Sequence, residues 1–366
     1  MKDKLTAGII GCGEIANVST APAMNEAKNV KIGMVMDVVE WAAEDLGKKY
    51  GVPHTTDAKE LLSNPEIDFV YIATPHYLHA PYAIEAARAG KHVIVEKPIS
   101  VSLRDADAMI AECKRKGVWL STCFPMRYLP EVEKAKEIVG GGLIGKLIGT
   151  TITSMGVKPD SYWEGGYTGR IKSEWRKSKQ KTGGGVLIMN CVHDIDYVRH
   201  VTGLEAKRVY GEYGTFLTPV EVEDYVCVLI RYSNGAIGTI RASSCLEDLP
   251  RVGPRGNRIH GSEGEIVVSN PLWVRTKKET ELGEAGKWNE IKLEKGRSSA
   301  TRFFEAFAEA VLSGREPPVT GEDGRKALEV IVAAYESGLK AKPIDLPLRP
   351  KGPRKTGKGA RRKTSR

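Results

Sequence analysis

A lysine with the potential for acid–base chemistry stands in Glu96-Lys97-Pro98, directly after the apolar run His92–Val95. The apolar run predicts a buried strand, and Pro98 restricts the backbone that follows Lys97. A lysine at such a strand end can hydrogen-bond a hydroxyl group and favour its ionised form while a hydride leaves the neighbouring carbon. An ordinary Lys–Glu ion pair is the structural alternative.

A second polar segment, residues 74–79, follows the apolar run Phe69–Ala73. Ligands of open α/β sheets bind at the carboxyl ends of the parallel strands, where both polar segments begin. We therefore expect a cofactor site that includes Thr74, Pro75, His76, His79, Glu96 and Lys97.

Residues 8–16 place Gly-x-Gly-x-x-Ala, with Gly11, Gly13 and Ala16, after an apolar run that begins at Leu5. In a dinucleotide-binding turn the first glycine allows a tight bend and the second lets the backbone approach a pyrophosphate. The small third residue allows helix and strand to pack closely, and the helix amides face the anion. We expect Glu14 and Ile15 to belong to this site. Glycine-rich turns also occur where only a sharp bend is needed.

Asp37 ends the next apolar run, Val30–Met36, about 20 residues beyond the glycine turn, where a carboxylate binds the adenosine ribose. No Arg or Lys follows it directly, which favours NAD over NADP. Lys48 or Lys49 reaching back would admit NADP. A further alternative is that Asp37 only caps the following helix.

The composition indicates a globular chain with two domains, at 366 residues and 41% hydrophobic residues. No run approaches the length of a membrane span, and no secretory signal peptide is recognisable. Six scattered cysteines without a Cys-x-x-Cys pair suggest reduced thiols and no metal site. We therefore expect a cytoplasmic protein that does not associate with membranes.

The formal net charge of +9 comes from the tail after Leu348, which holds nine Lys or Arg residues and no acidic residue. Such a tail cannot bury a core, and we expect residues 347–366 to be disordered. The tail could make weak contact with nucleic acid. We favour a solvated tail instead, because no aromatic residues lie between its charges.

Residues 1–125 alternate strand and helix patterns, which predicts a doubly wound parallel sheet that binds NAD(P). The expected helices are Trp41–Tyr50, Ala58–Leu62, Pro81–Ala89 and Leu103–Lys116, and a further strand is Val118–Cys123.

Residues 126–346 predict an α+β domain with a large, mostly antiparallel sheet. Ser233-Asn234-Gly235 is a hairpin signal, and Gly156–Lys181 has the composition of a loop over a site. Helices near Thr301–Leu312 and Asp323–Leu339 should close this domain. Helices on one face leave the other face of the sheet for a partner copy, so we expect a homodimer or homotetramer.

The motif series resembles the glucose–fructose oxidoreductase, inositol dehydrogenase and MocA (Gfo/Idh/MocA) family of NAD(P)-dependent oxidoreductases. Its elements are the glycine turn, Asp37, Glu96-Lys97-Pro98, Gly183-Gly-Gly185 with His193-x-x-Asp196, and the segment from Gly321 to Ser337. The resemblance covers about residues 5–346. It implies a Rossmann domain, an oligomerising sheet domain, and hydride transfer at a secondary alcohol of a sugar, glycoside or cyclitol.

The resemblance further implies that Lys97 is catalytic and that His193 accepts the proton of the alcohol. The family often has an aspartate four residues before this histidine, where this chain has Met189. A thioether cannot accept that proton, and Asn190 is left as a polar support for substrate or imidazole. We expect Asp196 to be structural.

Substrate contacts are expected from two regions. Arg127 and Tyr128 follow the last strand of the first domain and should face the cleft. Trp175-Arg176 matches a Trp-Arg pair that often precedes the triple glycine in such enzymes. Tyr162 and Trp163 would contact a sugar similarly, or else anchor their loop.

Two other functions stay open. One is redox-neutral chemistry, in which a retained NAD oxidises and later re-reduces the sugar around an elimination or epimerisation. The other is a nucleotide-dependent regulator without catalysis, against which the presence of Lys97 and His193 argues.

Overall fold

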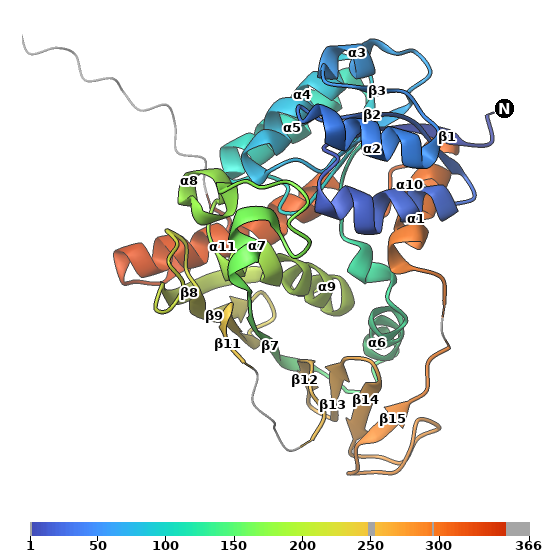
Figure 1. Cartoon of the computed structure of the whole chain (residues 1–366). Coiled ribbons are helices and arrows are strands. Elements are labelled where there is room, and N and C mark those ends of the chain that lie inside the picture. Colours follow the sequence, from blue (N-terminus) through green and yellow to red (C-terminus); the bar gives the residue numbers. More distant parts are fainter. Residues whose placement is uncertain (1, 248–252, 295, 349–366) are drawn as a thin grey trace, which may run out of the picture.

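The computed structural model describes residues 2–247, 253–294 and 296–348. The tail that the sequence predicts to be disordered spans residues 347–366. Residues 349–366 of it lie outside the described part. Two sheets dominate the fold, and Figure 1 shows them one above the other with helices between and around them.

The first sheet has six parallel strands in the order β3-β2-β1-β4-β5-β6. Its strands are β1 (Leu5–Ile10), β2 (Val30–Met36), β3 (His54–Thr55), β4 (Phe69–Ile72), β5 (His92–Val95) and β6 (Leu120–Thr122). Its helices are α1 (Ala21–Glu26), α2 (Glu40–Tyr50), α3 (Ala58–Ser63), α4 (His79–Arg88) and α5 (Leu103–Lys116). The strand order reverses between β1 and β4, which is the switch point where such sheets bind ligands.

Local sequence signals explain where these helices begin and end. The side chain of Asp57 accepts a hydrogen bond from the amide of Lys59 and so caps α3. Gly51 and Gly117, with φ of +66° and +68°, end α2 and α5 in the left-handed conformation. A π-helical turn, Ala16–Thr20, leads from the glycine turn into α1.

The second sheet has ten strands and is mostly antiparallel, with β7 and β10 as its parallel pair. Its strands are β7 (Leu147–Val157), β8 (Ala206–Gly214), β9 (Tyr225–Tyr232), β10 (Ile237–Ser243), β11 (Cys245–Leu246), β12 (Asn257–Gly261), β13 (Gly264–Val268), β14 (Leu272–Thr276), β15 (Asn289–Ile291) and β16 (Ile344–Asp345). Gly235 closes the predicted hairpin between β9 and β10 with a φ of +87°. The predicted fold class is confirmed.

The remaining helices are α6 (Pro130–Gly140), α7 (Asp160–Gly165), α8 (Lys179–Thr182), α9 (Val192–Thr202), α10 (Ser299–Leu312) and α11 (Gly321–Lys340). The sequence predicted that α10 helps to close the second domain, but this helix packs on the parallel sheet of the first domain. Phe304 and Phe307 of α10 pack on Tyr71 and Phe69 of β4, at ring distances of 5.6 and 5.3 Å. Figure 1 shows α10 beside α1. The apolar stripe of α10 thus buries against the parallel sheet, because the chain returns there after β15.

Segment 156–181, predicted as a loop, contains the short helices α7 and α8 and a 3-10 turn at Trp175–Lys177. It leaves the second sheet after β7 and reaches back to the first sheet.

Candidate active site

A cavity of about 550 Å³ lies at the carboxyl edge of the parallel sheet. The glycine turn, the ends of β2, β4 and β5, segment 162–176 and Met189 line it. The cavity therefore lies between the parallel sheet and segments of the second domain, at the switch point where the sequence predicted the cofactor.

The glycine turn has the shape that a pyrophosphate requires. Gly11 has a φ of +100°, and a Cβ atom there would lie 2.7 Å from the carbonyl carbon of Ala73. A Cβ atom on Gly13 would meet nothing within 4 Å, so the backbone there borders open space. The side chain of Ala16 is fully buried under the turn. These residues fit a dinucleotide, and the turn would hold its phosphates.

Asp37 lines the same cavity and is 9% exposed. Its carboxylate accepts hydrogen bonds from the amides of Cys12 at 2.7 Å and Val39 at 2.9 Å. It thus connects the glycine turn to the end of β2. Lys48 pairs with Glu44, and Lys49 bonds to Asn17. The residues fit NAD.

The polar segment after β4 is tied to the segment after β5. The ring of His79 is buried between the carbonyl oxygens of Pro98, 2.8 Å from Nδ1, and Thr74, 3.0 Å from Nε2. The ring of His76 lies 3.0 Å from the carbonyl oxygen of Thr182 and packs edge-on against Trp175. Thr74, Pro75, His76 and His79 all line the cavity.

Lys97 lines the cavity and donates a hydrogen bond from Nζ to the carbonyl oxygen of Met189 at 2.9 Å. Glu96 accepts from the hydroxyl of Tyr71 at 2.6 Å and from the amide of Lys97 at 3.1 Å. Burial lowers the pKa of Lys97 below 10.5, and the charge of Glu96 raises it in part. The lysine is therefore held at the strand end with its ammonium group in the cavity.

His193 lies on α9 beside the cavity and outside its lining, and its ring packs edge-on against Phe124 at 6.0 Å. Burial, followed by the charge of Lys97, lowers the pKa of His193 well below 6.5, so the imidazole is neutral at pH 7. Its Nδ1 atom is buried and has no hydrogen-bond partner in the described part of the chain. Met189 lines the cavity, and Asn190 does not.

Arg127 and Tyr128 are not brought into the cavity. The Arg127 guanidinium is 5% exposed and bonds Asp196 at 2.8 and 2.6 Å, and it also pairs with Asp323 at 3.1 Å. Tyr128 packs edge-on against Phe303 of α10. After β6 the chain turns into the space between α9, α10 and α11, which sequence spacing alone does not reveal.

Tyr162, Trp175 and Arg176 do line the cavity. The Arg176 guanidinium lies 4.7 Å from the Trp175 ring centre and 5.1 Å from that of Tyr162. Trp163 is 3% exposed and packs edge-on against Tyr162, so it anchors the segment.

The sequence did not predict how segment 156–181 joins the glycine turn. The carboxylate of Glu14 accepts hydrogen bonds from the amides of Tyr167 at 3.0 Å and Thr168 at 2.7 Å. Arg170 donates to the carbonyl oxygen of Cys12 at 3.0 Å and pairs with Asp45 at 2.5 Å. We call residues 166–170 the strap, because they cross from the second sheet onto the turn.

Glu223 also contributes to the site in a way that the sequence did not predict. Its carboxylate accepts from the amides of Gly185 at 2.6 Å and Leu187 at 3.0 Å, and from the hydroxyl of Tyr335 at 2.7 Å. A Cβ atom on Gly185 would lie 1.9 Å from the carbonyl oxygen of Glu223. The triple glycine thus allows the buried carboxylate of Glu223 to hold the backbone of residues 185–187, which directly precedes Met189.

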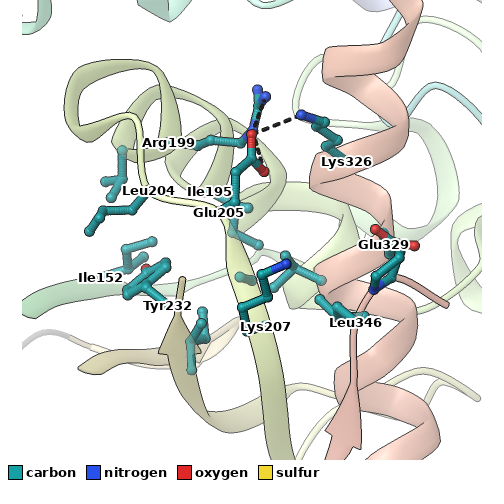
Figure 2. A pocket seen from close by; sticks show the side chains of 15 residues that line it. Ile152, Ile195, Arg199, Leu204, Glu205, Lys207, Tyr232, Lys326, Glu329 and Leu346 are labelled. Atoms are coloured by element: carbon teal, nitrogen blue, oxygen red, sulfur yellow. Dashed lines mark hydrogen bonds and ion pairs between the residues drawn. The ribbon is translucent and has the colours of Figure 1, made fainter. Parts of the chain in front are cut away.

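A second cavity, of about 230 Å³, lies between α9, α11 and the edge of the antiparallel sheet. Figure 2 shows that Arg199 and Lys326 both reach Glu205 at its rim, each at 2.8 Å. Its floor is apolar, with Ile152, Ile195 and Leu204. Because these rim charges pair with one another, we assign the chemistry to the first cavity.

Within residues 2–247, 253–294 and 296–348, no helix is both long and apolar enough to cross a membrane. The same ranges contain no cluster of three or more His, Cys, Asp or Glu residues that could hold a metal ion.

Comparisons with known proteins identify the family of the chain. Residues 5–124 match a family model described as an oxidoreductase family with an NAD-binding Rossmann fold, and residues 132–267 match the GFO/IDH/MocA C-terminal domain. The chain is 30% identical over 341 residues to the myo-inositol 2-dehydrogenase of Thermotoga maritima, covering 90% of this chain and 95% of that protein. It is 29% identical to the scyllo-inositol 2-dehydrogenase (NAD(+)) of Bacillus subtilis over 366 residues, or 94% and 97% of the two chains.

Among solved structures, levoglucosan dehydrogenase in complex with NADH and levoglucosan superposes with a TM-score of 0.82 and 26% identity. The match covers 94% of this chain and all of that one. Together with the family models, these similarities show that the chain belongs to the Gfo/Idh/MocA family of NAD-dependent oxidoreductases.

Proposed function

We propose that this enzyme transfers a hydride between a secondary alcohol of a sugar, glycoside or cyclitol and NAD. The observation that carries the proposal is the position of Lys97, whose ammonium group enters the cavity that the glycine turn also lines. Relatives named for inositols and levoglucosan support this substrate class.

NAD supplies the hydride acceptor when it is bound by the glycine turn and Asp37. We propose that the ammonium group of Lys97 hydrogen-bonds the substrate hydroxyl oxygen and stabilises its negative charge as the hydride leaves. The neutral imidazole of His193, with its unpaired Nδ1 atom, is the proposed acceptor of the hydroxyl proton. Asn190 is the proposed polar support next to it, and Trp175 and Tyr162 would contact the sugar ring.

The proposal is tested by incubating the pure protein with NAD and a panel of sugars, glycosides and inositols. We expect NADH to form with at least one of them. With a substrate deuterated at the reacting carbon, the label should appear in the NADH. Formation of NADH without the label would contradict direct hydride transfer.

The strap favours a second candidate, redox-neutral chemistry with a retained cofactor. Glu14 and Arg170 fasten the strap over the turn that holds the phosphates. In that case the protein copurifies with NAD or NADH and converts a sugar without net NADH. Cofactor-free protein that turns over only with added NAD would exclude this candidate.

We also propose that the face of the second sheet opposite its helices joins copies of this chain into a homodimer or homotetramer. Leu229 of β9 and Ile237 of β10 are 52% and 49% exposed there. Sedimentation analysis should give an oligomer for the native chain and a monomer for Leu229→Glu combined with Ile237→Glu. A native monomer would contradict the proposal.

A further inference from the structure

Lys97 directly follows a buried carboxylate, yet in the described part of the chain the two side chains form no ion pair. Glu96 is 7% exposed. A buried carboxylate normally pairs with a neighbouring cation, because an unpaired buried charge is unfavourable. The ammonium group of Lys97 instead donates to the carbonyl oxygen of Met189 at 2.9 Å. A group other than this ammonium must therefore satisfy Glu96.

The hydroxyl of Tyr71 is that group. It donates to Oε1 of Glu96 at 2.6 Å, which is the short distance of a hydrogen bond to a charged acceptor. Tyr71 is fully buried on β4, next to β5, and its ring packs edge-on against Phe304 of α10 at 5.6 Å. The packing holds the hydroxyl in one place, and the hydroxyl in turn fixes one oxygen of the carboxylate.

The remaining donors to Glu96 are weaker. Its Oε2 atom accepts from the backbone amide of Lys97 at 3.1 Å, and the thiol of Cys123, directly after β6, also hydrogen-bonds the carboxylate. An uncharged amide at that distance and a thiol bind a carboxylate less strongly than a phenol at 2.6 Å. Tyr71 is therefore the main group that sets the direction of the Glu96 carboxylate.

Other charged groups around Lys97 do not take the place of Glu96. Asp194 of α9 is a second carboxylate within electrostatic reach of the lysine, but the side-chain amide of Asn257 donates to it at 2.6 Å. Two cations and three imidazoles are also within reach: Lys158, Arg176, His76, His79 and His193. We therefore expect Lys97 to pair with Glu96 as soon as the carboxylate is released.

We infer that Tyr71 is a positioning residue, whose hydroxyl keeps the Glu96 carboxylate from pairing with Lys97 and so leaves the ammonium group directed at Met189 and the cavity. Tyr71 itself does not line the cavity. The inference rests on the proposed function only for its consequence, which is that the ammonium group stays available for hydride transfer.

The test measures the chemical reactivity of Lys97 in the variant Tyr71→Phe, which removes only the hydroxyl. Competitive labelling with acetic anhydride and mass spectrometry gives this reactivity between about pH 7 and 10, without a substrate. An ion pair with Glu96 stabilises the ammonium form, and only the free amine reacts. We therefore expect Lys97 to react about 3- to 10-fold more slowly in Tyr71→Phe than in the native enzyme. With a substrate from the panel, kcat should fall by about 5- to 50-fold while the Kd for NADH changes little.

The double variant Tyr71→Phe with Glu96→Gln is the rescue. A neutral amide cannot form the ion pair, so Lys97 should regain at least its native reactivity, and kcat should rise above that of Tyr71→Phe. Tyr232→Phe is the matched control, because it also removes a buried hydroxyl, which is hydrogen-bonded to Thr150 at 2.8 Å in the second sheet. It should leave the reactivity of Lys97 and kcat at their native values.

The outcomes separate this inference from the proposed reaction. Slower labelling in Tyr71→Phe that Glu96→Gln reverses supports the inference, whether or not the native enzyme forms NADH with any substrate. Unchanged or faster labelling in Tyr71→Phe would overturn it even if kcat falls, because Tyr71 would then be only structural. Slower labelling that Glu96→Gln does not reverse would also overturn it, since a group other than Glu96 would then hold the lysine. A native enzyme that forms no NADH with the whole panel contradicts the proposed reaction alone.

Discussion

The ammonium group of Lys97 donates a hydrogen bond to the carbonyl oxygen of Met189 at 2.9 Å, across 92 residues of sequence. The bond joins the end of β5 in the parallel sheet to the turn that precedes α9. It places the lysine between the strand ends of the proposed cofactor site and the helix that carries His193.

Glu223 holds the turn before α9, in which the carbonyl oxygen of Met189 accepts the hydrogen bond of Lys97. Glu223→Gln keeps the shape of the side chain and replaces one accepting oxygen by a donor, which faces the amide of Gly185 or Leu187. We expect a loss of about 1–3 kcal/mol in the free energy of unfolding, because a buried amide is left without an acceptor. We also expect kcat to fall while the Kd for NADH changes little. Glu66→Gln, at an exposed position, is the control for both measurements. If kcat stays at the native value although the stability falls, Glu223 is only structural.

Two titrating groups predict the pH dependence of kcat/KM. The proposed reaction requires neutral His193 and charged Lys97. Burial lowers the pKa of His193 well below 6.5, so activity should persist as the pH falls through 6.5. Burial also lowers the pKa of Lys97, so the alkaline loss should begin below pH 10.5. A profile from pH 5 to 10.5 checks both limits. If kcat/KM falls with decreasing pH already at or above pH 6.5 while the enzyme stays folded, the assignment of His193 is wrong.

Arg127 is expected to stabilise the fold without contacting the substrate. Arg127→Met leaves Asp196 buried at 1% exposure without its cation, which should cost about 3–5 kcal/mol of stability. Replacing Asp196 by Asn in the same chain should restore part of that loss, because the uncompensated charge is removed. Denaturant unfolding of the single and double variants measures the effect. If Arg127→Met keeps the native stability and raises KM, Arg127 contacts the substrate after all.

The strap should control how fast the cofactor leaves. Glu14→Gln weakens the charge-assisted hydrogen bonds to the amides of Tyr167 and Thr168, and Arg170→Met removes the ion pair with Asp45. We expect NADH to dissociate about 3- to 30-fold faster in each variant, as for the loss of about 0.7–2 kcal/mol. Stopped-flow fluorescence of bound NADH gives the rate directly, with Lys59→Met as the control. Rates equal to the native one in both variants would show that the strap does not gate the cofactor.

The cofactor half of the site follows from local sequence. Gly11, Gly13 and Asp37 act through backbone shape and position next to strands, and strand ends are recognisable from apolar runs. These residues and the ends of β4 and β5 therefore line one cavity, as the sequence predicted.

The contacts that cross between the sheets were not predictable in the same way. The strap on Glu14, the carboxylate of Glu223 under the triple glycine, and the burial of Arg127 against Asp196 all depend on tertiary packing. Residues such as Glu223 and Asp196 carry no local signal that distinguishes them from surface carboxylates. The docking of α10 on the parallel sheet has the same origin, since its apolar stripe fits either sheet.

We propose that Lys97 stabilises the alcohol oxygen while the hydride leaves. The most direct test measures kcat for Lys97→Met alongside its Kd for NADH, with the substrate found by the panel. We predict that kcat falls by about 100- to 10,000-fold and that NADH binds about as tightly as in the native enzyme. A Lys97→Met enzyme that keeps the native kcat would contradict it.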